Sequence, residues 1–170
     1  GQISQIKNVT IEFTDLDAIK ATIIERQPAI IWCADSGETR CYFADEVGFI
    51  FSSAPQFSAN VFYTVSGNLP DDPVGKFAPN AKDLQEITQF LYLIEGTAKN
   101  GMSNLPVFST VDINDEGEYE ALVRPRGGTA SSTWKIFFKG GQDPKELVSN
   151  LATILGSDVF KKETGGNLSK

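Results

Sequence analysis

The sequence predicts an α+β fold, a largely antiparallel mixed sheet with two amphipathic helices packed on one face. Three observations favour this class. Apolar and polar side chains alternate with a period of two, typical of strands, over much of the chain. Apolar residues recur at helical spacing in only two places, residues 84–94 and 147–155. The expected strands and helices come in runs and do not alternate one by one, which favours a mostly antiparallel sheet with helices on one side.

The first part of the chain is expected to form strands. Residues 9–13 alternate, so one face of this strand should be buried. Residues 19–24 alternate after the turn formers Asp15 and Asp17, so the two segments predict a hairpin. Further short strands are expected at residues 29–32, 42–43, 49–51 and 61–65.

The middle of the chain predicts a surface loop and a helix. Residues 66–80 are rich in Gly, Pro and Asp, which is typical of an irregular loop. Asn80 is a good N-cap, and the apolar residues from Leu84 to Ile94 predict an amphipathic helix that ends between Gly96 and Gly101.

The last part predicts three strands and a second helix. The strands are expected at residues 107–113, 119–123 and 134–138, with a turn at Gly127 and Gly128. Asp143 followed by Pro144 predicts a helix start, and the apolar face then continues to Leu155. The tail from Lys161 to Lys170 is polar and rich in Gly.

Composition disfavours most enzyme classes. The chain has 170 residues, of which 41% are hydrophobic, enough for one domain or two small ones. Its formal net charge of −7 disfavours nucleic acid as a partner, because phosphates favour Lys and Arg. The absence of His excludes Ser-His and Cys-His catalysis and His-ligated metal sites. We therefore expect no enzymatic activity, no cofactor, no bound metal and no small-molecule substrate.

Cys33 and Cys41 are equidistant from Gly37, the centre of an expected turn. A hairpin would place them opposite each other, close to disulfide range. A disulfide is therefore predicted if the protein resides in an oxidising compartment. The alternative is two small buried thiols in a reduced protein.

Two other features of the sequence have the residue types of a possible site. Residues 112–117 superficially resemble a calcium loop, but the required oxygen ligands and the closing Glu are missing, so a solvated hairpin tip is the better interpretation. Trp134, Phe137 and Phe138 give one strand apolar side chains on both faces. Such a strand is buried on both faces or meets a partner.

Two motifs resemble the FtsQ/DivIB family of bacterial cell-division proteins. Glu25-Arg26-Gln27-Pro28, followed by Trp32, is similar to the Glu-Arg-x-Pro-like element that closes the family's POTRA domain. Asp45-Glu46-Val47-Gly48-Phe49-Ile50-Phe51 is similar to the Asp-x-x-Gly-x-Phe-like turn that opens the family's β domain. The later order of helix, three strands and helix fits as well.

The resemblance implies two domains. Residues 1–28 would be the last two strands of a POTRA-like domain, and residues 29–170 an FtsQ-like β domain without its closing strands. The chain begins with Gly1, not Met, and we expect an internal fragment. Its parent would be a single-pass protein of the bacterial cell membrane, with this fragment on the extracytoplasmic side.

The resemblance also implies a function. The chain would be a non-enzymatic scaffold for septum assembly that binds divisome proteins of the FtsB/FtsL type, partly by strand addition to a sheet edge. In the family that edge is the closing strand, which this chain would lack, so the nearest candidates are on the strand at residues 133–139 and the helix at residues 143–155. The candidate partner-binding residues are Trp134, Ile136, Phe137, Phe138 and Leu151. The alternative is an extracellular or periplasmic binding module, POTRA-like or adhesin-type, that is unrelated to division.

Overall fold

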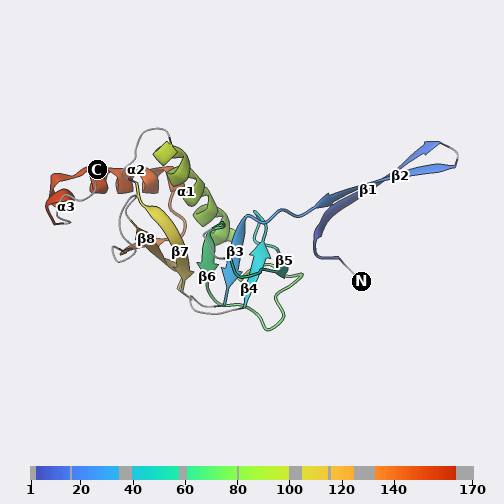
Figure 1. Cartoon of the computed structure of the whole chain (residues 1–170), viewed down its shortest axis with the longest axis horizontal. Helices are drawn as coiled ribbons and strands as arrows, with labels where there is room; N and C mark the ends of the chain where they lie inside the picture. Colours follow the sequence, from blue (N-terminus) through green and yellow to red (C-terminus); the bar gives the residue numbers. More distant parts are fainter. Residues whose placement is uncertain are drawn as a thin grey trace.

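The computed structural model describes residues 3–15, 17–34, 40–57, 61–79, 81–99, 105–114, 116–124 and 133–163. Within these residues it contains a two-stranded hairpin, a seven-stranded sheet and three helices (Figure 1). The predicted α+β class is confirmed. The predicted turns at Gly37 and at Gly127 and Gly128, the cap at Asn80 and the last residues of the tail lie outside the described residues.

The large sheet has the strand order β5-β4-β3-β6-β7-β8-β9. The pairs β3–β6 and β6–β7 are parallel and the other pairs are antiparallel, so the sheet is mixed. The strands are β3 (Ile30–Cys33), β4 (Cys41–Ala44), β5 (Ile50–Ser53), β6 (Thr64–Ser66), β7 (Val107–Ile113), β8 (Glu118–Arg124) and β9 (Trp134–Lys139).

Two helices, α1 (Ala81–Lys99) and α2 (Pro144–Gly156), cover one face of this sheet (Figure 1). The Asp143 side chain caps α2 by accepting a hydrogen bond from the Lys145 N–H at 2.9 Å, as its sequence position predicts. A third helix, α3 (Asp158–Glu163), was not predicted. Its Phe160 ring packs edge-on against Trp134, with ring centroids 5.2 Å apart.

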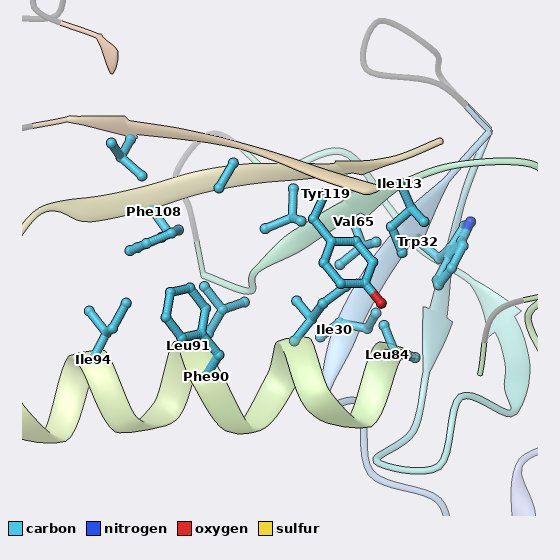
Figure 2. Packing of buried hydrophobic residues seen from close by; sticks show 14 of the residues in the cluster. Ile30, Trp32, Val65, Leu84, Phe90, Leu91, Ile94, Phe108, Ile113 and Tyr119 are labelled. Atoms are coloured by element: carbon cyan, nitrogen blue, oxygen red, sulfur yellow. The ribbon is translucent and has the colours of Figure 1, made fainter. Parts of the chain in front are cut away.

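The core lies between α1 and the sheet. Figure 2 shows Leu84, Leu91 and Ile94 on α1 directed towards side chains of the strands, with Phe108 near Ile94. Trp32 is almost fully buried at the other end of this layer. The side chains of α1 that face the sheet are those that the helical spacing predicts.

The opposite face of the sheet carries a smaller aromatic cluster. The Phe43 ring lies 6.2 Å from Phe51, 6.2 Å from Phe57 and 5.5 Å from Phe62, measured between centroids. The strand predicted at residues 61–65 begins only at Thr64, and the Phe62 ring before it packs in this cluster.

The helix expected to end between Gly96 and Gly101 ends at Lys99, within that range, and it passes through Gly96. Glycine ends a helix where it adopts a left-handed conformation. Gly96 is not among the glycines with positive φ, so it leaves the helical hydrogen bonding intact.

The hairpin of β1 (Ile6–Asp15) and β2 (Ala18–Glu25) projects from the rest of the molecule (Figure 1). One of its faces is entirely apolar, because the register pairs Val9 with Ile23, Ile11 with Ala21, and Phe13 with Ile19. The expectation that this face is buried is wrong for the described residues. Phe13 is 81% exposed, and the neighbouring apolar side chains are exposed too, since no described element packs on them.

Candidate interaction surfaces

A disulfide joins Cys33 on β3 to Cys41 on β4. The two residues are paired directly across the strands, with Cα atoms 4.2 Å apart. Their sulfurs therefore link the end of β3 to the start of β4, the position that symmetry about Gly37 predicts.

Removal of this disulfide is expected to cost about 2.5 kcal/mol of unfolding free energy, the chain-entropy value for a closed loop of roughly ten residues. The comparison is between the oxidised protein and the Cys33→Ala/Cys41→Ala double variant in urea unfolding. Mass measurement after thiol alkylation checks the starting state. Two alkylated thiols in protein kept oxidising throughout purification would contradict the disulfide.

Arg26 joins the hairpin to the large sheet. Its Nη1 donates to the Asp45 carboxylate at 2.5 Å, and its Nε donates to the Ser4 carbonyl at 3.2 Å. The guanidinium also lies 3.9 Å from the centroid of the Phe49 ring, a cation–π contact. One side chain thus contacts the base of the hairpin and the β4–β5 turn.

Asp45 is held from its other side by backbone groups. Its carboxylate accepts hydrogen bonds from the Val47 N–H at 3.1 Å and the Phe49 N–H at 2.9 Å. Gly48, with φ of 80°, closes this turn, a conformation that favours glycine. The two sequence motifs on which the family resemblance depends are therefore in direct contact. We name the contact of Arg26, Asp45 and Phe49 the Arg26 joint.

The strand β9 forms one end of the large sheet. Among the described residues, no strand lies on its far side. The Gly140 N–H donates to the Gly117 carbonyl, and hydrogen bonds alternate along an antiparallel pair. The main-chain groups of Trp134, Ile136 and Phe138 therefore point towards β8. Those of Lys135, Phe137 and Lys139 point towards the open edge.

The other end of the sheet, β5, is partly covered. The Ile50 N–H donates to the Lys76 carbonyl at 2.9 Å, and the Gly75 N–H donates to the Ile50 carbonyl at 2.8 Å. Phe49 and Phe77 form an isolated bridge beside it. Residues 75–77 thus occupy hydrogen-bonding groups that a partner strand would need, and β9 is the more accessible edge.

The structure separates the candidate partner-binding residues. Leu151 is 8% exposed within the core, and Trp134, Ile136 and Phe138 pack towards the helices. Leu151 is therefore buried, and Trp134, Ile136 and Phe138 are partly exposed on the face of β9 that the helices cover. Phe137 points to the outer face and is 69% exposed. Among the five candidates, Phe137 is the most exposed.

Ion pairs flank Phe137 on the outer face. Lys135 Nζ lies 2.5 Å from a Glu120 carboxylate oxygen, and Lys139 Nζ lies 3.2 Å from Glu118. The hydrogen bond from Lys139 holds the pKa of Glu118 below its ordinary value, and Asn114 adds a second hydrogen bond. Both lysines are thereby paired with β8.

A carboxyl pair lies beside these residues. Asp112 on β7 faces Glu120 on β8 and accepts a hydrogen bond from the Ser66 hydroxyl. Burial raises the pKa of Asp112 above its ordinary value of 3.8, the Glu120 carboxylate raises it further, and Lys135 lowers it. Protonation of Asp112 therefore stabilises the folded state. This stabilisation is lost as the pH rises through the raised pKa of Asp112 in the folded protein.

Asp112→Asn is expected to unfold at higher urea concentration than the native chain at pH 7, because the amide carries no charge and can still accept from Ser66. The difference should shrink as the pH falls from 7 towards 3.8, where native Asp112 takes up its proton. Urea midpoints of both proteins across this range provide the measurement. A difference that stays constant with pH would show that the Asp112 charge does not act on stability.

No family model matches the chain, and a search of curated proteins found no match. In the part of the chain that the structure describes, no helix is long and apolar enough to cross a membrane. No group of three or more acidic, Cys or His side chains in that same part could hold a metal ion.

The sequence indicates a motif at Arg26 but does not predict its contact with Asp45. This contact joins positions 19 residues apart in the chain.

Proposed function

We propose that this chain is part of a non-enzymatic scaffold of the FtsQ/DivIB type, which recruits divisome proteins of the FtsB/FtsL type during septum assembly. The observation that carries the proposal is the edge of β9, on whose far side no strand lies within the described part of the chain. An exposed row of strand N–H and C=O groups is a template for a partner strand. Main-chain hydrogen bonds would supply affinity, and side-chain contacts would supply selectivity.

The chemistry of the edge supports strand addition. Phe137 offers a large apolar contact on the outer face, next to the paired Lys135 and Lys139. An added strand would therefore meet one exposed aromatic side chain between two neutralised charges. Such an edge favours a partner segment that is itself apolar near its centre.

The hairpin supports the proposal that residues 1–28 belong to a POTRA-like domain. A two-stranded hairpin is marginally stable alone and normally needs a helix or a further strand on its apolar face. The exposed face of Val9, Ile11, Phe13, Ile19, Ala21 and Ile23 is such a surface. We propose that another segment of the parent protein covers it.

The disulfide supports an extracytoplasmic location. Disulfides persist in oxidising compartments and are rare in the bacterial cytoplasm. The Cys33–Cys41 link therefore favours the side of the membrane on which an FtsQ-like fragment would reside. The proposed parent is anchored by one membrane helix outside the described residues.

The test is a titration of the chain with the extracytoplasmic segments of the FtsB-type and FtsL-type proteins encoded in the same genome. Calorimetry should detect saturable binding to at least one of them. Heat changes that do not saturate with either segment, for a chain that is folded by circular dichroism, would contradict the division role. That result would favour the alternative, an extracellular or periplasmic binding module unrelated to division.

A further inference from the structure

The hairpin of β1 and β2 extends away from the large sheet as a long arm (Figure 1). Its longer strand has 10 residues, which gives an arm of about 33 Å at ~3.3 Å per residue. A rotation of only ~10° at the base of such an arm would move its tip by ~6 Å. The direction in which the exposed apolar face points therefore depends on how firmly the base is held.

The backbone that connects the hairpin to the large sheet is short. The Arg26 N–H donates to the Gln5 carbonyl at 2.8 Å, which ties Arg26 to the hairpin. The Ala29 N–H donates to the Ala44 carbonyl at 2.9 Å, which ties Ala29 to β4. Only two residues lie between Arg26 and Ala29, and the second of them is Pro28. Proline fixes its own φ and restricts the residue before it, so few torsions of this segment are free to turn.

One guanidinium bridges the hairpin and the large sheet beside this segment. Arg26 Nε donates to the Ser4 carbonyl at the base of the hairpin, and Nη1 donates to Asp45 in the β4–β5 turn. Both donors belong to one planar group, so the two acceptors are held in a fixed relative orientation. A lysine can pair with Asp45, but its ammonium is a single charge on a flexible stem and imposes no such orientation.

The groups that receive the guanidinium are themselves fixed. Two backbone N–H groups of the β4–β5 turn hold the Asp45 carboxylate. The Phe49 ring is buried and packs edge-on against Phe77, with centroids 5.3 Å apart. The Lys7–Glu46 ion pair also connects the hairpin to this turn, but both of its side chains are exposed, so it orients the hairpin only weakly. The orientation of the hairpin thus depends mainly on the Arg26 joint.

We propose that the Arg26 joint holds the hairpin at one angle to the large sheet, and that the hairpin turns about residues 27–28 when the planar guanidinium is lost. Arg26 is then a positioning residue, since it sets the direction in which the apolar face of β1 and β2 is presented for contact. The proposal concerns the base of the hairpin, so it does not depend on the edge of β9 or on the proposed division role.

Residual dipolar couplings of the backbone amides test this angle, because they report the orientation and the motion of each element in a weakly aligned sample. In the native chain, one alignment tensor should fit the couplings of β1 and β2 together with those of the large sheet. In Arg26→Lys, the hairpin couplings should shrink at least twofold relative to those of the sheet. Cα chemical shifts of β1 and β2 show whether the hairpin itself stays paired.

Two further variants complete the test. Lys7→Met removes the exposed ion pair and should leave the single tensor unchanged. Asp45→Asn removes the charge that the guanidinium contacts and should shrink the hairpin couplings as Arg26→Lys does, so the test stands if one of these two variants is unstable. Native hairpin couplings below half of those that the sheet tensor predicts, native couplings in both Arg26→Lys and Asp45→Asn, or an equal reduction in Lys7→Met would each overturn the proposal. Loss of the strand chemical shifts in Arg26→Lys and Asp45→Asn would overturn it too, because Arg26 would then maintain the hairpin and not its angle.

Discussion

Arg26→Met is expected to lower the free energy of unfolding by about 3 kcal/mol, because it leaves a buried carboxylate without its cation. The Asp45 side chain is only 3% exposed and the Arg26 side chain 16%. Methionine keeps much of the aliphatic volume of Arg26 and removes the charge, the hydrogen bonds and the cation–π contact with Phe49. Urea unfolding followed by circular dichroism measures the change.

Two controls assign that loss to the Arg26 joint. Lys7→Met breaks the neighbouring Lys7–Glu46 pair at 2.8 Å, which is exposed and should contribute less than about 1 kcal/mol. The double variant Arg26→Met/Asp45→Asn should be more stable than the sum of the single changes predicts, because no charge is then left buried. If Arg26→Met and Lys7→Met cost the same, the Arg26 joint is not a strong contact.

Phe137→Pro is expected to weaken binding of the partner segment about 100-fold, equivalent to about 2.7 kcal/mol. Proline removes the main-chain N–H that points to the open edge of β9, and its ring obstructs an incoming strand. The hydrogen bonds between β9 and β8 remain, because they come from the neighbouring residues. Calorimetric titration with the FtsB-type or FtsL-type segment measures the effect.

Phe137→Ala is the matched control. It removes the same aromatic side chain and keeps the N–H, so its effect on binding should stay below about tenfold. Both variants should unfold at nearly the same urea concentration, since Phe137 lies on the exposed face. Equal losses in the two variants would indicate side-chain recognition without strand addition.

Local features of the fold could be predicted from the sequence. The two-residue period located most strands, and the Asp143-Pro144 pair located the start of α2. Symmetry about Gly37 placed Cys33 opposite Cys41. These features depend on residues that are close together in the chain, so local patterns contain the information.

Features that depend on distant contacts could not be predicted. Alternation in β9 shows that the strand has two faces but not which one the helices cover, so Phe137 was grouped with three inward-facing neighbours. The same limit applies to β1, whose apolar face is exposed although its pattern predicts burial. The strand order β3-β6-β7 likewise depends on contacts between distant segments, which no local pattern contains.

Amide hydrogen exchange of β9 with and without the partner segment tests the central claim most directly. Strand addition predicts that the Lys135, Phe137 and Lys139 amides exchange quickly in the free protein and become strongly protected on binding. The Trp134, Ile136 and Phe138 amides, which point towards β8, should be protected in both states. Saturable binding that leaves the Lys135, Phe137 and Lys139 amides as exchangeable as before would contradict recruitment through the edge of β9.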